Sequence, residues 1–195
     1  MQTTIFQGAY RITEWITKLV YLNMLWILFT VVGIIGLGIF PATNAVFAIT
    51  RKWNMGEEVP LFQTFLDVYK KEFKKSNLIG YLLLVIGILL KYDMETFQNI
   101  VLRYLSGFFY FVFLVVLVYI GPVFAHYNTT IVKQLKFSLL IAITNPVKSI
   151  MMIATVVGVT YVFLTFFNMI PFFSISCTAI LLTYFSHKAF PKGGN

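Results

Sequence analysis

A run of 32 consecutive residues, 19–50, contains no Lys, Arg, Asp, Glu or His. An α-helix needs about 20 apolar residues to cross the hydrocarbon core of a bilayer. The run is therefore longer than one membrane-spanning helix and short for two such helices. The way in which it folds determines on which side of a membrane the following segments lie.

The composition predicts a membrane protein. Charged residues make up 11% of the 195 residues and hydrophobic residues 59%, whereas a soluble domain has about 25% charged residues. The apolar runs are continuous rather than alternating, which predicts helices instead of the strands of a membrane barrel. We expect an all-α polytopic transmembrane bundle of five or six membrane helices, with six favoured, in one integral membrane domain over residues 1–195.

Two ways of folding the uncharged run compete. In the first, residues 19–40 form one span and residues 41–50 lie at the interface, which gives five spans. In the second, the run over residues 19–53 is a hairpin whose return helix has a proline in its first turn, a position that tolerates it. The residues that form the break of this hairpin are Gly33, Gly36, Gly38 and Pro41.

The positive charges favour the hairpin. It places every Lys and Arg except Lys91 and Arg103 on one side of the membrane. The single span would move Arg11 and Lys18 to the opposite side as well. Because basic residues concentrate in cytoplasmic loops, we expect a multi-pass protein of the bacterial plasma membrane with both termini in the cytoplasm. The net charge of +8 then predicts contact with anionic lipid at that face.

Residues 61–75 form the clearest amphipathic helix. Its aromatic face consists of Phe62, Phe65, Leu66, Tyr69 and Phe73, and its C-terminal end carries Lys70, Lys71, Lys74 and Lys75. These spacings place the apolar residues on one side of a helix. Such a helix fits a membrane surface or packing within the protein. It also fits docking onto a partner protein.

The remaining segments follow the same alternation of apolar and basic stretches. Residues 1–18 predict an amphipathic lead-in along the membrane interface, and residues 126–144 a second, weaker amphipathic helix. Spans are expected over residues 77–90, 104–125, 147–167 and 172–185. Ser76 and Asn77 are expected to cap the first of these spans, Pro122 to kink or end the second, and Asn145-Pro146 to open the third.

Motifs of enzymes and cofactor sites are missing from the sequence. There is no Ser-His-Asp set, HExxH motif, carboxylate pair or phosphate loop. His126 and His187 lie far apart with no acidic residue nearby, and the single cysteine, Cys177, can form no internal disulfide. We therefore expect no enzymatic activity, no metal, no cofactor and, without a recognisable nucleic-acid module, no nucleic-acid partner.

A few polar residues fall within the apolar segments. The polar residues Asn23, Thr43 and Asn44, together with Gly38 and Pro41 of the break, form a small candidate set. Polar residues in membrane helices often form hydrogen bonds between helices. The alternative interpretation is a binding site at the break, because discontinuous helices form the substrate sites of many transporters.

Several of these motifs resemble the YesL family of small bacterial integral membrane proteins. The resemblance rests on 22-LNMLW-26, the GxxPAT break at residues 38–43, RKW at 51–53 with GEE at 56–58, FxxF at 62–65 and NP at 145–146. One departure is Phe40, which stands before Pro41 where a common family form has Gly.

The resemblance implies a role near carbohydrate uptake. Members of this family are typically encoded beside carbohydrate ABC-type uptake systems, polysaccharide-degrading enzymes and sensor–regulator pairs. The first hypothesis is therefore a non-enzymatic accessory factor for carbohydrate (ABC-type) uptake or its sensing, with ABC permease subunits or a membrane sensor kinase as partners. The alternative is a small stand-alone transporter or channel for a neutral solute such as a sugar.

Overall fold

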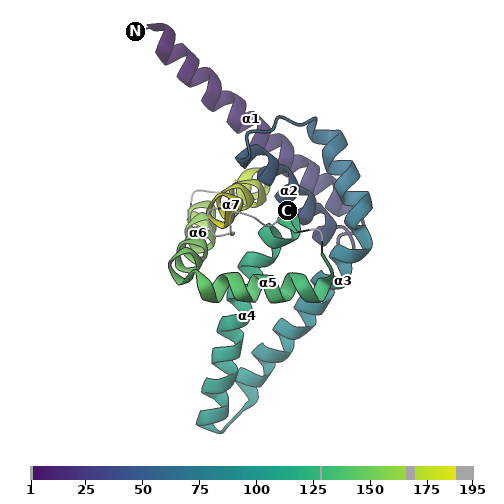
Figure 1. Cartoon of the computed structure of the whole chain (residues 1–195), viewed down its shortest axis with the longest axis vertical. Coiled ribbons are helices and arrows are strands. Elements are labelled where there is room, and N and C mark those ends of the chain that lie inside the picture. Colours follow the sequence, from purple (N-terminus) through teal and green to yellow (C-terminus); the bar gives the residue numbers. More distant parts are fainter. Residues whose placement is uncertain (1, 128, 166–169, 188–195) are drawn as a thin grey trace.

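The computed structural model describes residues 2–127, 129–165 and 170–187. Over these residues the chain forms seven helices and no strand, which confirms the predicted all-α helical bundle (Figure 1). In chain order the helices are α1 (Gln2–Val32), α2 (Ile39–Asn54), α3 (Leu61–Thr96), α4 (Ile100–His126), α5 (Ile131–Thr144), α6 (Pro146–Thr165) and α7 (Ile170–His187).

Four of the described helices are long and apolar enough to cross a membrane. These stretches are Tyr10–Val32 of α1, Leu61–Thr96, Ile100–His126 and Pro146–Thr165. The apolar stretch of α7, Phe173–Ser186, is shorter. α2 has 16 residues and extends about 24 Å at 1.5 Å per residue, less than the hydrocarbon core of about 30 Å.

α1 is one uninterrupted helix of 31 residues. The predicted lead-in is therefore continuous with the first membrane helix and does not turn away from it. Figure 1 shows the N-terminal part of α1 extending away from the other helices. Near the bundle, the ring of Trp15 packs edge-on against Trp53 with centroids 5.7 Å apart. Lys18 pairs with Glu14 at 2.6 Å and Glu58 at 3.6 Å. These contacts join α1 to the end of α2 and the following loop.

The chain turns back over residues 33–38, within the glycine-rich segment where the hairpin interpretation places its break. Residues 19–40 therefore do not form one helix. α2 packs against α1, α3, α4 and α7, so it occupies the centre of the bundle. Its buried residues are Pro41, Ala42, Ala45, Val46, Phe47, Ile49 and Thr50. A central helix contacts protein rather than lipid, which explains how a short helix can belong to a membrane bundle.

The expected cap at Ser76 and Asn77 is wrong, because both residues lie inside α3. The amphipathic helix over residues 61–75 and the span over residues 77–90 are two parts of this one helix of 36 residues. The cap preference of Asn is local, and here it is outweighed by tertiary hydrogen bonds. The amide of Asn77 donates to the carbonyl of Phe73 in its own helix and to that of Leu37 in the bend, both at 2.9 Å.

α3 and α4 form a long helical hairpin that extends to the bottom of Figure 1. Its turn is shorter than the predicted polar tip and covers residues 97–99. Asn99 caps α4 by accepting a hydrogen bond from the N–H of Val101 at 2.9 Å. Pro122 does not end α4, which continues to His126. There the imidazole Nδ1 accepts a hydrogen bond from Nε of Arg51 at 3.2 Å, which joins the ends of α2 and α4.

α5 is the predicted second amphipathic helix, and Figure 1 shows it lying across α4. Asn145 ends α5, and α6 begins at Pro146 as expected. α6 packs mainly against α7 and lies at the outside of the bundle. α7 begins at Ile170, two residues before the predicted span over residues 172–185, and the end of the predicted span over residues 147–167 lies outside the described residues.

Candidate functional site

The bend between α1 and α2 is closed by its own backbone. The N–H groups of Gly33, Ile34 and Ile35 donate to carbonyls in the last turn of α1 at 3.0, 3.0 and 2.9 Å. Ile34 and Ile35 have φ angles of 58° and 49°, which β-branched residues rarely adopt. An added Cβ on Gly38 would collide with the carbonyl oxygen of Thr30. The bend is thus tight. Its N–H groups form hydrogen bonds within the protein, as backbone groups inside a membrane must, because no water is present there.

Two polar side chains of α3 support this bend. The hydroxyl of Tyr69 donates to the carbonyl of Phe29 at 3.1 Å, and the amide of Asn77 reaches the carbonyl of Leu37. Both side chains are buried. Because each satisfies a carbonyl at or near the bend, the geometry of the α1–α2 hairpin depends on the position of α3.

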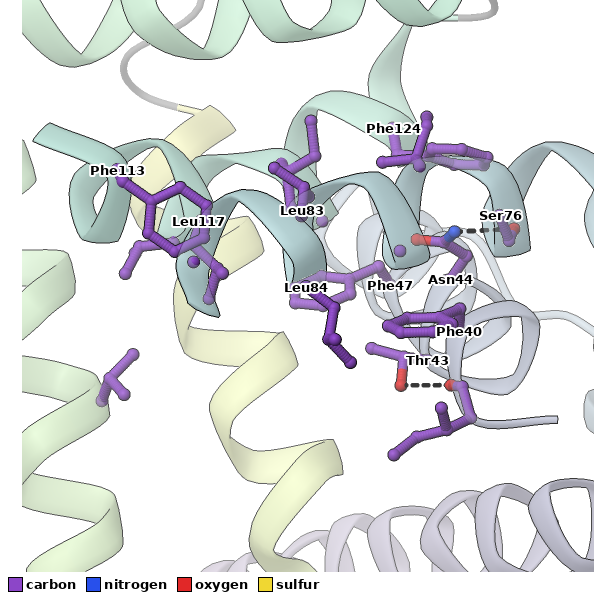
Figure 2. A pocket seen from close by; sticks show the side chains of 18 of the residues that line it. Phe40, Thr43, Asn44, Phe47, Ser76, Leu83, Leu84, Phe113, Leu117 and Phe124 are labelled. Atoms are coloured by element: carbon purple, nitrogen blue, oxygen red, sulfur yellow. Dashed lines mark hydrogen bonds between the residues drawn. The ribbon is translucent and has the colours of Figure 1, made fainter. Parts of the chain in front are cut away.

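A cavity of about 670 Å³ lies beside the hairpin, with walls from α2, α3, α4, α6 and α7. Most of its wall is apolar and aromatic; the main members are Phe40, Phe47, Leu83, Phe113, Leu117 and Phe124. Figure 2 shows the polar side chains of Thr43, Asn44 and Ser76 together toward one side of this view, while Phe113 and Leu117 lie toward the other. The cavity therefore has one polar end and a long apolar body.

Each polar side chain at this end makes a hydrogen bond within the protein. Nδ2 of Asn44 donates to the hydroxyl of Ser76 at 2.7 Å. The hydroxyl of Thr43 donates to the carbonyl of Ile39 at 2.7 Å and accepts from Nε1 of Trp26 at 3.0 Å. These bonds hold α1, α2 and α3 together, so most of this polarity serves the packing of helices.

The other polar side chains of the wall are Thr178, Lys91 and Tyr110. The hydroxyl of Thr178 donates to the carbonyl of Ser174 in its own helix at 2.7 Å. Among the described residues that line the cavity, Lys91 is the one charged side chain. General acid–base catalysis needs a titratable group placed against the reacting atom, and a sugar needs several free hydroxyl or amide partners. The wall is suited instead to an apolar group.

Two glycines on neighbouring helices shape the cavity. A Cβ on Gly80 of α3 would collide with the ring of Phe40, and a Cβ on Gly121 of α4 would collide with the ring of Phe47. The ring of Phe40 also packs edge-on against Tyr81, with centroids 5.3 Å apart. Phe40, the departure from the common family form, therefore occupies space that a side chain at residue 80 would fill.

The structure separates the five residues predicted at the break. Thr43 and Asn44 line the cavity, whereas Asn23, Gly38 and Pro41 do not. Asn23 is fully buried against α7, where its Oδ1 accepts a hydrogen bond from the N–H of Ser176 at 3.3 Å. Gly38 and Pro41 are also buried, the first in the bend and the second in the first turn of α2.

The aromatic face of residues 61–75 packs largely within the protein. Phe65 is fully buried and Tyr69 nearly so, and the ring centroids of both lie 5.1 Å from that of Phe29. Leu66 and Phe73 are half-buried. Phe62, at the edge of the face, is 45% exposed. A partner protein could reach Phe62 but not Phe65 without separating α3 from α1.

The lysines of this helix differ in their surroundings. Lys70, Lys71 and Lys74 are exposed. Lys75 is half-buried, and its Nζ lies 4.8 Å from the centre of the Phe124 ring, a cation–π distance. The helical pattern alone assigned all four lysines to one basic end and gave no sign of this difference.

Several residues of the cavity were missed in the sequence. Ser76 was interpreted as a cap, Gly121 with Pro122 as a kink or end of a span, and Gly80 and Phe124 as parts of ordinary spans. The available signal was small: glycines inside apolar helices often mark close contacts between helices. Phe113, Leu117 and Leu83 carried no signal, because any apolar residue would fit the same pattern.

The chain is similar in sequence to three proteins of Bacillus subtilis over most of its length. The chain is 33% identical to the uncharacterized protein YesL of Bacillus subtilis (strain 168) over 191 residues, which are 96% of this chain and 91% of YesL. The uncharacterized proteins YteU and YesV of the same organism are 36% and 33% identical, over 85% and 98% of this chain and 78% and 96% of their own lengths.

The family described as "Protein of unknown function, DUF624" matches residues 19–94. This segment contains the C-terminal part of α1, all of α2 and most of α3, and thus the bend, its supporting side chains and the polar end of the cavity. No solved structure matches the chain. With this match and its similarity to YesL, YteU and YesV over most of its length, the chain belongs to the DUF624 family of YesL-like proteins.

Proposed function

We propose that this protein is a non-enzymatic accessory factor for carbohydrate uptake of the ABC type, or for its sensing, in the bacterial plasma membrane. The observation that carries the proposal is the cavity beside α2. Its polar side chains Thr43, Asn44 and Ser76 are bonded to one another, to Trp26 or to the backbone. The carbohydrate context comes from the resemblance to the YesL family, whose members are typically encoded beside such uptake systems.

A stand-alone sugar transporter is the competing function. Its support is the position of Thr43 and Asn44 at the polar end of the cavity, close to the break between α1 and α2. Substrate sites of transporters form at such discontinuities. The apolar wall of the cavity argues against a sugar site. A sugar that leaves water must regain its hydrogen bonds from the protein, and each missing one costs about 1–3 kcal/mol.

The test measures uptake of a labelled oligosaccharide by the carbohydrate ABC importers of the bacterium, with and without this protein. We expect uptake to fall when the gene is deleted and to recover when it is supplied from a plasmid. Purified protein alone in liposomes should move no sugar across a broad panel. Unchanged uptake after deletion would refute the accessory role, and sugar flux in liposomes would establish the transporter instead.

A second experiment tests whether the exposed lysines of α3 contact the uptake system on the cytoplasmic side. The variant replaces Lys70, Lys71 and Lys74 with Gln, which removes three charges and leaves the buried face of α3 intact. Uptake should fall to the level of the deletion at normal expression. A control variant with Gln at Arg103, at the opposite end of the α3–α4 hairpin, should retain uptake. Equal losses in both variants would reject the lysines as the contact.

We also propose that both termini and the N-terminal part of α3 face the cytoplasm. The support is the charge distribution, because basic residues concentrate on that side. In a Cys177→Ser background, cysteines introduced at Thr3 and Gln63 should react with an impermeant maleimide only after the cells are opened, and one at Gln98 in intact cells. Labelling of Thr3 and Gln63 from opposite sides would contradict this topology.

A further inference from the structure

A second hollow lies where the chain passes from α4 to α5. It has a volume of about 760 Å³, and it is lined by Lys75, Thr129, Thr130, Ile131, Val132 and Lys133. Lys75 comes from α3 and Lys133 from the first turn of α5. Two lysines from different helices thus share a hollow in which the described lining contains no acidic residue.

The polar groups around this hollow favour an anion. The first turn of α5 has no acidic residue, and the side chain of Thr130 at its start makes no capping hydrogen bond. The N–H groups of the first turn of a helix lack partners within the helix and carry partial positive charge. The Oγ1 atom of Thr129 is buried, and it has no hydrogen-bond partner among the described residues. Lysines, free N–H groups and a free hydroxyl are the donors that a phosphate group requires.

The basic hollow adjoins the apolar cavity beside α2. Lys75 lines the hollow and also lies over the ring of Phe124, which lines the cavity. Ile131 makes a second connection, because it lines the hollow and packs against the cluster of Ile79, Leu83 and Phe124. The two spaces therefore meet along Lys75, Phe124 and Ile131.

The cavity is long enough for one lipid chain. The cavity follows α3 from Ser76 to Lys91, a helical length of about 22 Å at 1.5 Å per residue. Half of a bilayer core, the depth of one leaflet, is about 15 Å. The apolar residues in this stretch, such as Leu83 and Leu84, face the chain as they would face lipid.

We propose that this protein binds one anionic phospholipid, with the phosphate between Lys75 and Lys133 and an acyl chain in the cavity beside α2. Basic pockets between membrane helices on the cytoplasmic side bind anionic head groups in other proteins. The Lys75 side chain is held by Phe124 at the junction of the two spaces, so it positions the head group relative to the chain. The site does not depend on the role in carbohydrate uptake.

The test uses native mass spectrometry of the purified full chain in detergent, with phosphatidylglycerol and phosphatidylcholine of identical chains. We expect one phosphatidylglycerol per protein to be retained in preference to phosphatidylcholine. Replacing Lys75 and Lys133 with Gln should weaken the binding of phosphatidylglycerol by about twenty-five-fold, about five-fold for each lysine. The control Lys71→Gln, an exposed lysine of the same helix, should bind like the wild type.

Three results would overturn the proposal. Equal retention of the two lipids by the wild type would mean that the head group is not recognised. An equal loss in Lys71→Gln would mean that charge acts without a site. Glycerol phosphate or inorganic phosphate binding as tightly as the lipid would mean that the cavity holds no chain. If the double variant does not fold, Lys133→Gln alone is measured. A loss of about five-fold supports the site, and a loss no larger than that of Lys71→Gln means that charge acts without a site.

Discussion

Replacing Phe65 with Ala tests whether the aromatic face of α3 belongs to the core. The side chain is fully buried, and its ring centroid lies 5.1 Å from Phe29 and 6.4 Å from Tyr69. Truncating a buried Phe to Ala costs about 3–5 kcal/mol, because apolar contacts are lost and a cavity remains. In a chain of this size each kcal/mol lowers the unfolding midpoint by about 2–4 °C. We expect a decrease between about 6 and about 20 °C.

The matched control is Phe62→Ala on the same face of the same helix. Phe62 is 45% exposed, and its ring centroid lies 6.2 Å from that of Phe29. Exposed substitutions usually change stability by about 0.5 kcal/mol, so the midpoint should move by about 2 °C. Unfolding can be followed in detergent with a fluorogenic maleimide, because the single cysteine, Cys177, is half-buried in α7 and reacts more as the bundle opens.

The comparison of the two variants defines the result that would contradict the packing of α3 against α1. If the aromatic face were a docking surface, Phe65→Ala and Phe62→Ala would leave the isolated protein equally stable and would differ only in partner binding. Equal midpoints within about 2 °C would therefore contradict the packing of α3 against α1. A large decrease for Phe65→Ala alone would mean that loss of partner binding in that variant reflects unfolding.

Two further predictions concern the cavity wall. A double-mutant cycle of Asn44→Ala and Ser76→Ala, read by chemical unfolding in detergent, should give a coupling of about 0.6 kcal/mol, typical of hydrogen bonds between membrane helices; a coupling of zero would contradict the 2.7 Å bond. Gly80→Ala should destabilise the protein by about 1–3 kcal/mol, because its Cβ would collide with Phe40. Phe40→Leu in the same chain should restore part of the unfolding midpoint, and no restoration would show that the ring is not the obstacle.

The helices and their approximate limits could be predicted because each carries a local signal. The bend at residues 33–38 follows a cluster of glycines, and α6 begins at the expected Asn145-Pro146. The prediction that Ser76 and Asn77 cap a helix was wrong, and of the two outcomes predicted at Pro122, a kink or an end, the helix end is excluded. At residues 76 and 77 a local cap competes with hydrogen bonds to residues far along the chain, and the tertiary bonds are present in α3.

The candidate site was predictable only in part. Thr43 and Asn44 were identified because polar residues are rare in an apolar run. Their partners Trp26 and Ser76 were not, since a hydrogen-bond pattern between helices has no fixed spacing in sequence. Nothing in the sequence distinguished Lys75 from its neighbouring lysines, although its contact with Phe124 differs from theirs.

The sequence by itself determined that the chain is a helical membrane protein, where most of its helices run and where the first hairpin turns. Hydropathy and glycine content act locally, so they can be interpreted without knowing the fold. Only the tertiary structure decided that the short helix α2 is the centre of the bundle and that Phe65 is core rather than surface. It also placed the apolar cavity next to the basic hollow. These features depend on which apolar helix faces pack together. The chain has many apolar faces, so the hydropathy pattern alone does not show which of them form pairs.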